Sequence, residues 1–332
     1  MKQRQVLFIH GGGGEAFEGD GALVRSLRGA LGPGFRVDED IRELQWRTSM
    51  KFEDKNVEDH VYSVTSGDGT RIAFERLGDG PPVILVAGAS CDRAITRPLA
   101  EELAEQFTVI NYDRRGRGDS GDTQPYEVER EIEDIGALIA EAGGAASVYG
   151  HSSGAALALR AAARGLPISR LVLHEPPYAP DSEEWRRASR EYGEKLRTML
   201  AEGRRGDAAA LFMTTVGMPQ EMVEGMRKEP WWAGMEKVAP TLAYDSEIMD
   251  DISRDGTIPT HLLGTVPSPT LVLCGGASPE WMIDVGRQVA DGLPDGKLSI
   301  LEGQEHAVPP EVLVPVLAGF LTTRVNQAEE GG

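Results

Sequence analysis

Short apolar runs alternate with segments of helical periodicity from residue 59 onward. Runs such as 82–87 (PVILVA) are apolar without interruption, which is typical of strands buried on both faces of a parallel sheet. The pattern predicts βαβ units, with strands at 60–65, 71–75, 82–87, 107–112, 146–149, 170–174, 269–274 and 298–301 and helices at 97–106, 127–141, 153–164, 279–293 and 310–322. We therefore expect an α/β fold with a mostly parallel central sheet.

Two segments depart from this alternation. Residues 178–262 contain no strand-like run and several stretches of helical spacing, so we expect a helical cap over the open end of the sheet. Near the N-terminus, residues 6–9 and 35–37 resemble 83–86 and 107–109, which indicates a partial internal repeat of one strand–helix–strand unit. The predicted organisation is an N-terminal extension (1–40), a linker (41–58), a core (59–177 and 263–323), the cap (178–262) and a flexible tail (324–332). The extension would pad the sheet or contact a second subunit in a homodimer.

Composition narrows the class of protein. The 332 residues include 53 Asp and Glu against 34 Lys and Arg, a net charge of −19. This balance argues against nucleic acid or an anionic membrane as a partner, because both are bound through clustered basic side chains. The two cysteines, Cys91 and Cys274, lie far apart in apolar stretches, which excludes a disulfide framework and a Cys-based zinc site. Without a signal-peptide pattern or a run of about 18 apolar residues, a cytoplasmic protein is expected.

The segment Gly150-His151-Ser152-Ser153-Gly154 matches the G-x-S-x-G pattern of a nucleophilic serine. An apolar strand leads into the motif and an alanine-rich helix leaves it, which is the context that the pattern requires. A Gly-rich turn at a helix N-terminus can instead bind phosphate. Because neither G-x-G-x-x-G nor G-x-x-x-x-G-K-S/T is present, we interpret Ser152 as a nucleophile.

A serine hydroxyl needs a positioned base to become nucleophilic at neutral pH, and one histidine fits that role. His306 follows the last predicted strand, so its loop reaches the carboxyl edge of the sheet, where the Ser152 turn also opens. The remaining histidines precede the core, adjoin strand ends too close to their own backbone, or precede a strand at the opposite edge: His10, His60, His151, His174 and His261.

Residues 59–323 resemble the α/β-hydrolase superfamily, through DRRGRGDS after the fourth core strand, GHSSG, and the histidine after the last strand. The resemblance implies a triad in the order Ser, Asp or Glu, His. Most members carry the acid after the seventh strand, where this chain has Ser278, which cannot hold the charge. Haloalkane dehalogenases and zearalenone-type lactone hydrolases can place it after the sixth strand, at the position of Glu175. We predict Glu175 as the acid, with Glu280 as the weaker substitute.

The same resemblance implies two backbone donors for an oxyanion. One is the N–H of Ser153, the residue after the nucleophile, and the other is the N–H of Ala89, in the loop after the third core strand. Cys91 lies nearby, but with no base placed for it a buried structural thiol is the expected reading.

The predicted cap supplies aromatic and thioether side chains, of which Trp231, Trp232, Met235 and Tyr244 are expected to line an apolar substrate pocket. The sequence thus predicts a serine hydrolase of an uncharged carboxylic ester or lactone, acting through Ser152, His306 and Glu175 without a metal or organic cofactor. Three alternatives stay open: a perhydrolase or a lyase with the same triad, and a non-catalytic ligand-binding protein on the hydrolase scaffold.

Overall fold

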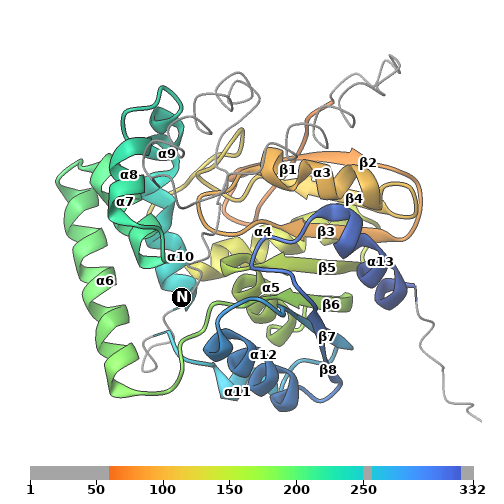
Figure 1. The fold of residues 1–332 in the computed structure, drawn as a ribbon. Helices are drawn as coiled ribbons and strands as arrows, with labels where there is room; N and C mark the ends of the chain where they lie inside the picture. Colours follow the sequence, from red (N-terminus) through yellow and green to blue (C-terminus); the bar gives the residue numbers. More distant parts are fainter. Residues whose placement is uncertain (1–59, 250–255, 323–332) are drawn as a thin grey trace, which may run out of the picture.

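An eight-stranded sheet forms the centre of the molecule. In the computed structural model, which describes residues 60–249 and 256–322, the strands lie in the order β1-β2-β4-β3-β5-β6-β7-β8 (Figure 1). Their bounds are β1 Tyr62–Thr65, β2 Arg71–Leu77, β3 Pro82–Val86, β4 Thr108–Tyr112, β5 Ala146–His151, β6 Ile168–His174, β7 Thr270–Gly275 and β8 Gly296–Leu301. The pairs β1–β2 and β2–β4 are antiparallel, whereas the remaining pairs are parallel. This confirms the predicted α/β fold.

Helices cover both faces of the sheet because its strands are apolar on both faces. Along β7, Val272 packs into the cluster around α5 and α12, while its neighbours Leu271 and Leu273 pack into the opposite cluster with α3 and α13. This alternation follows from the period of two along a strand. The helices of the two layers are α3 Arg93–Leu103, α4 Val128–Glu141, α5 Ser153–Ala163, α11 Thr260–Leu263, α12 Glu280–Gly292 and α13 Pro310–Leu321.

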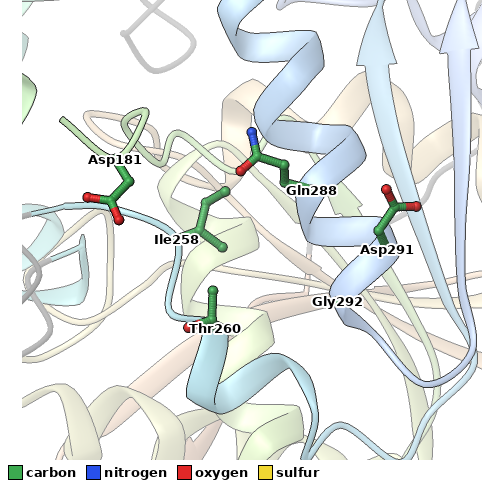
Figure 2. Close-up of a pocket in the computed structure, with 6 residues that line it drawn as sticks. All are labelled: Asp181, Ile258, Thr260, Gln288, Asp291 and Gly292. Atoms are coloured by element: carbon green, nitrogen blue, oxygen red, sulfur yellow. The ribbon is translucent and has the colours of Figure 1, made fainter.

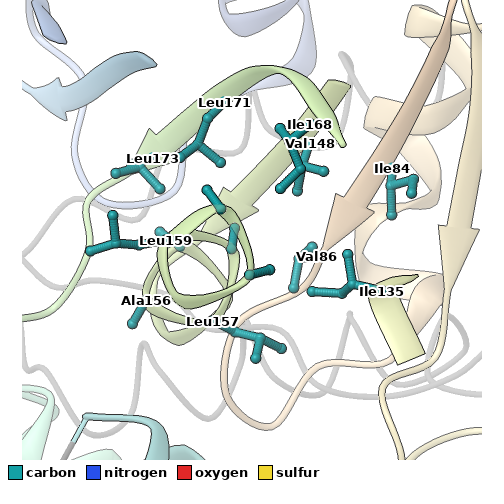
Figure 3. Packing of buried hydrophobic residues seen from close by; sticks show 14 of the residues in the cluster. Ile84, Val86, Ile135, Val148, Ala156, Leu157, Leu159, Ile168, Leu171 and Leu173 are labelled. Carbon is teal, nitrogen blue, oxygen red and sulfur yellow. The ribbon is translucent and has the colours of Figure 1, made fainter. Parts of the chain in front are cut away.

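Helix α5 lies in the middle of the larger cluster. Figure 3 shows its side chains, Leu157 and Leu159 among them, surrounded by residues of the neighbouring strands and of α4. Alanine at 155, 156, 158, 161 and 162 keeps the helix narrow, and all five residues are fully buried. The close approach of α5 to β5 and β6 fixes the position of its first turn, where the predicted nucleophile lies.

The insertion between β6 and β7 is helical, and its helices gather at one end of the molecule, away from α13 (Figure 1). They are α6 Glu183–Ala201, α7 Arg205–Thr215, α8 Gln220–Met226, α9 Trp232–Val238, the 3₁₀ helix η2 Ala239–Thr241 and α10 Leu242–Met249. They enclose an apolar cluster of their own, which we call the cap cluster and which includes Leu196, Met213, Met222 and Trp232. The two ends of the insertion meet, since the Ala179 N–H donates to the Gly256 carbonyl at 2.8 Å.

Helix α3 differs most from its predicted bounds. It begins at Arg93 rather than at 97, because Asp92 caps it by accepting a hydrogen bond from the Ala94 N–H at 3.0 Å. Pro98 lies inside the helix, where the sequence suggested a helix start. Strand β5 also extends two residues beyond its predicted end, to His151. None of the described helices is long and apolar enough to cross a bilayer.

The predicted N-terminal extension (1–40), the linker (41–58) and the tail (324–332) lie outside the described residues. The repeat of residues 6–9 and 35–37 therefore stays a prediction.

Candidate active site

Ser152 lies on a sharp turn between β5 and α5 with φ 55° and ψ −125°. Two glycines permit this turn because a side chain at either would collide with backbone. A Cβ at Gly150 would lie 2.4 Å from the Gly154 carbonyl oxygen, and a Cβ at Gly154 would lie 2.2 Å from the Val86 carbonyl oxygen. The motif thus lets the strand, the helix and the neighbouring β3 approach one another closely, and it holds Ser152 in a strained conformation.

The side chains of His306 and Glu175 meet at the carboxyl edge of the sheet. His306 comes from the loop after β8 and Glu175 directly follows β6, and His306 Nδ1 lies 2.5 Å from Glu175 Oε2. The carboxylate is fully buried and the imidazole is mostly buried. A carboxylate at Nδ1 fixes the ring so that Nε2 is left to act as a base.

The loop after β7 completes the surroundings of Glu175. The second carboxylate oxygen of Glu175, Oε1, accepts hydrogen bonds from the Gly275 N–H at 2.7 Å and from the Ser278 hydroxyl at 2.6 Å. Burial would raise the pKa of Glu175, but the hydrogen bonds from His306, Ser278 and Gly275 outweigh it and lower the pKa. Ser278, at the position where the resemblance led us to expect an acid, thus donates to Glu175, the predicted acid. Glu280, the alternative acid, is exposed at the start of α12.

The loop after β3 lies against the predicted nucleophile. A Cβ at Gly88 would lie 3.2 Å from the Ser152 Cβ, so the backbone preceding Ala89 is next to Ser152. Ser153 opens α5, and the first N–H groups of a helix have no partner within it. The two predicted oxyanion donors, the N–H groups of Ala89 and Ser153, therefore belong to segments that flank Ser152.

Backbone strain is concentrated at this edge of the sheet. Within residues 60–249 and 256–322, the non-glycine residues with positive φ are Ser90 (58°), Ser152 (55°) and Glu175 (45°). Ser90 and Glu175 follow β3 and β6, the strands on either side of β5. Each of these three neighbouring strands is therefore followed by a residue with positive φ, which is uncommon for side chains other than glycine.

Two further histidines, the half-buried His151 and the buried His174, lie next to His306. The His151 ring centroid is 4.5 Å from that of His306 and 4.8 Å from that of His174, and His151 Nε2 lies 3.0 Å from the His306 carbonyl oxygen. His174 Nδ1 lies 2.7 Å from the Tyr149 hydroxyl. Burial lowers the pKa of His151 to about 3 and that of His174 well below its usual range. Both rings stay neutral at neutral pH, so they support the His306 loop without adding charge.

A buried ionic cluster lies on the other side of Ser152. We call Arg114, Arg117, Glu131, Ser153 and Asp245 the Asp245 cluster. Asp245, from cap helix α10, accepts hydrogen bonds from Arg114 at 2.8 Å, from Arg117 at 2.8 and 2.9 Å and from the Ser153 hydroxyl at 2.8 Å. Burial opposes ionisation of Asp245, but the two guanidinium groups and the Ser153 hydroxyl outweigh it and lower its pKa. The cluster joins the cap to the nucleophile turn.

The predicted substrate-contacting residues separate into two groups. Trp232 and Met235 are buried in the cap cluster, and Trp231 and Ala89 pack against that cluster, so the predicted oxyanion loop borders an apolar part of the cap. Tyr244 lies apart from them. Its hydroxyl is 2.7 Å from Asp122 and 2.6 Å from Gln124, and its ring stacks on Tyr126 at 3.8 Å. These contacts favour a structural role for Tyr244, whose part in substrate binding stays a prediction.

A cavity of about 370 Å³ lies elsewhere, between the ends of the cap insertion and α12 (Figure 2). Its lining includes none of the predicted site residues, and consists of Asp181, Ile258, Thr260, Gln288, Asp291 and Gly292. Within the described residues no group of His, Cys, Asp and Glu side chains is arranged to hold a metal ion.

Sequence reasoning missed the contact of His151 with His306 and the whole Asp245 cluster. The segment DRRGRGDS was used only as part of the resemblance to the α/β-hydrolase superfamily, although three arginines within four positions of an acidic chain are unusual enough to suggest buried ion pairs. Their partner Asp245 lies 128 positions from Arg117, on a helix whose pattern does not single it out.

Comparisons with known proteins agree with this architecture. A family model described as "Alpha/beta hydrolase family" matches residues 83–312. N-formylmaleamate deformylase of Pseudomonas putida is 38% identical over 117 residues, which are 34% of this chain and 44% of that protein. The chain therefore matches less than half the length of this relative.

Solved structures match over a longer range. The chain is similar to an alpha/beta hydrolase from Sphaerobacter thermophilus, with 54% identity and a TM-score of 0.71 over 79% of this chain and 100% of that chain. It is also similar to a thermophilic esterase from Thermogutta terrifontis, solved with malate bound, with 26% identity and a TM-score of 0.60 over 79% of this chain and 98% of that chain. With its sheet order, its nucleophile turn and the matched family model, the chain belongs to the alpha/beta hydrolase family.

Proposed function

We propose that this protein is a serine hydrolase that cleaves an uncharged carboxylic ester through Ser152, His306 and Glu175. The observation that carries the proposal is the 2.5 Å contact between His306 Nδ1 and the buried Glu175 carboxylate, at the same sheet edge as the strained Ser152 turn. A base oriented by a carboxylate, at the same sheet edge as a half-buried serine on a strained turn, fits the arrangement that activates a hydroxyl.

The reaction follows from these positions. Ser152 Oγ attacks the ester carbonyl carbon while His306 Nε2 takes the hydroxyl proton, and Glu175 stabilises the imidazolium that forms. The N–H groups of Ala89 and Ser153 bind the oxyanion. The imidazolium then protonates the leaving-group oxygen, and the alcohol departs and leaves an acyl-serine. His306 next takes a proton from a water molecule as that water attacks the acyl carbon, and the imidazolium returns this proton to Ser152 Oγ as the acid is released.

Two observations support an uncharged substrate. The cap residues that approach the oxyanion loop are apolar, and the net charge of −19 disfavours anionic ligands. The similarity to the Thermogutta esterase supports ester hydrolysis. Lactones are cyclic esters and react by the same steps, and the GHSSGA and HEPP motifs extend the proposal to them.

A second candidate is hydrolysis of an N-formyl amide. It rests on the 38% identity to N-formylmaleamate deformylase over 117 residues. The triad would perform the same attack, with a nitrogen leaving group that His306 must protonate.

The test is a substrate panel of p-nitrophenyl esters of increasing acyl length, an aryl lactone and an N-formyl amide, assayed with wild type and Ser152→Ala. We expect turnover of an ester or lactone by wild type and its loss in the variant. Cys91→Ala is the matched control, because burial raises the pKa of the Cys91 thiol to about 11 and keeps it protonated. Undiminished turnover in Ser152→Ala, or loss of turnover only in Cys91→Ala, contradicts the proposed nucleophile.

A fluorophosphonate probe separates this proposal from the remaining alternatives. An activated Ser152 is labelled quickly, whereas a non-catalytic ligand-binding protein is not. A perhydrolase would require peroxide and a lyase would release an aldehyde, so product analysis with and without peroxide distinguishes both from an esterase.

A further inference from the structure

The Asp245 cluster holds the backbone that carries the proposed oxyanion donors. Arg117 donates to the Gly88 carbonyl at 2.6 Å and to the Cys91 carbonyl at 3.4 Å, and Arg114 donates to the Ala87 carbonyl at 3.3 Å. These carbonyls flank Ala89 on both sides. The guanidinium groups themselves are fully buried, at 0% and 1% side-chain exposure.

The contact with Gly88 sets the direction of the Ala89 donor. The Gly88 carbonyl and the Ala89 N–H belong to one planar trans peptide unit, in which the C=O and the N–H point in opposite directions. When Arg117 holds the oxygen from one side, the N–H is directed to the other side. A cation on the oxygen also polarises the peptide unit, which strengthens its N–H as a donor.

Asp245 reaches the second donor segment directly. Its Oδ1 accepts from the Ser153 hydroxyl at 2.8 Å, and Arg114 lies 3.3 Å from the same hydroxyl. Arg114 also donates two hydrogen bonds of 2.8 Å to Glu131 of α4, which fix its guanidinium group in place. One carboxylate from the cap therefore contacts the first residue of α5 and both arginines that hold the loop after β3.

We propose that Asp245 is a positioning residue for the oxyanion hole, through which the cap orients the N–H groups of Ala89 and Ser153. The proposal rests on the proposed function. Asp245 does not touch the reacting atoms. It neutralises Arg114 and Arg117 and fixes their geometry, and they in turn fix the Gly88 carbonyl. Correct placement of both donors matters in the transition state more than in the bound substrate, since the negative charge develops only there.

The same loop provides a matched control. Arg115 forms an equally buried pair with Asp134 of α4, at 2.7 and 2.8 Å. Its other partners are Asp68 and the Arg130 carbonyl, and within the described residues it makes no hydrogen bond to Ser153 or to the loop 87–91. Disruption of either pair removes a buried ionic contact, but only the Asp245 pair is connected to the oxyanion donors.

The experiment compares Asp245→Asn with Asp134→Asn on the full chain, using an ester that wild type cleaves. We expect Asp245→Asn to lower kcat by about 10²-fold, the scale of loss for a misplaced catalytic donor, with KM little changed. The affinity for a trifluoromethyl ketone, whose serine adduct carries the oxyanion, should fall by a similar factor. Asp134→Asn should keep kcat and inhibitor affinity, although both variants lower the melting temperature.

A second pair of variants covers the case in which Asp245→Asn does not fold. Arg117→Lys keeps the charge but loses the fork that contacts both Gly88 and Asp245, and Arg115→Lys makes the same change on the control side. We expect kcat to fall only in Arg117→Lys.

Equal kcat and inhibitor affinity in Asp245→Asn and Asp134→Asn, or in the two lysine variants, would overturn the positioning role. Turnover that survives in Ser152→Ala would instead overturn the proposed function, so the two failures are distinguishable.

Discussion

The core around α5 and the cap above it bury their apolar side chains differently. The core cluster consists mainly of alanine and branched aliphatic residues, and Leu157, Leu159 and Leu171 within it are fully buried. The cap cluster contains five buried methionines: Met213, Met218, Met222, Met226 and Met235. Branched side chains have few rotamers and fix neighbouring backbone, whereas methionine adapts to irregular space. The difference places rigid geometry next to the proposed triad and adaptable packing next to the expected substrate.

The sharpest test of this contrast is the acid of the core. Glu175→Gln should lower kcat by about 10⁴-fold, since a neutral amide cannot stabilise the imidazolium and favours the wrong tautomer of His306. Steady-state kinetics measure the loss of kcat, and the melting temperature shows whether the variant is still folded. Glu280→Gln is the matched control, because Glu280 is exposed at the start of α12. If Glu280→Gln loses activity while Glu175→Gln retains it, the assignment of the acid is wrong.

Shortening a buried side chain should destabilise the protein more in the core than in the cap. Leu159 is fully buried between α5 and the sheet (Figure 3). We expect Leu159→Ala to lower the free energy of unfolding by about 2–5 kcal/mol, from lost apolar burial and the cavity left behind. Urea unfolding followed by circular dichroism measures this. A loss below about 1 kcal/mol would mean that the core collapses around the gap as freely as a methionine-rich cluster.

Acid sensitivity should arise in the core as well, because no histidine lies in the cap helices 183–249. Burial holds the pKa of His174 well below 6.5, so below that pH the unfolded chain takes up a proton that the folded chain does not. The free energy of unfolding should therefore decrease as the pH is lowered below 6.5, by about 1.4 kcal/mol per pH unit for this group. His174→Gln should reduce that slope by the same amount, in urea titrations between pH 7 and 5. Equal slopes in the two proteins would contradict a neutral, buried His174.

The smallest effect is expected from a change of shape in the cap. Met222→Leu conserves volume in a cluster of flexible side chains, so the free energy of unfolding should change by less than about 1.5 kcal/mol. The ratio of kcat/KM for short acyl esters to kcat/KM for long acyl esters should change clearly, while the free energy of unfolding changes little. A stability loss as large as that of Leu159→Ala would remove the contrast between the two clusters.

Local patterns predicted the elements that carry the site, but contacts between distant residues were not accessible from them. Ser152 followed from a five-residue motif and His306 from its place after the last strand. The choice of Glu175 depended on resemblance, together with Ser278 at the usual position of the acid. The start of α3 was misplaced by four residues, because the apolar pattern does not reveal the cap formed by Asp92, which determines the actual start.

The Asp245 cluster shows why the remainder was out of reach. Its members come from the loop after β4, from α4, from α5 and from α10, and the chain between Arg117 and Asp245 includes most of the cap. A buried ion pair leaves no periodic signal, since each partner alone looks like a surface residue. The contact of His151 with His306 likewise joins the end of β5 to a loop 155 positions further along the chain.

The three left-handed residues of the site have a consequence for how this protein would respond to selection. Ser90, Ser152 and Glu175 each hold a backbone conformation that costs on the order of 1–2 kcal/mol for a side chain other than glycine. A folded domain is stable by only about 5–15 kcal/mol in total, so these positions carry an appreciable fraction of that margin. A library screened for heat resistance alone should accumulate glycine there, whereas one screened for residual turnover should not. The two selections should therefore differ at these three positions, where a side chain expected to serve the reaction lowers the stability of the fold.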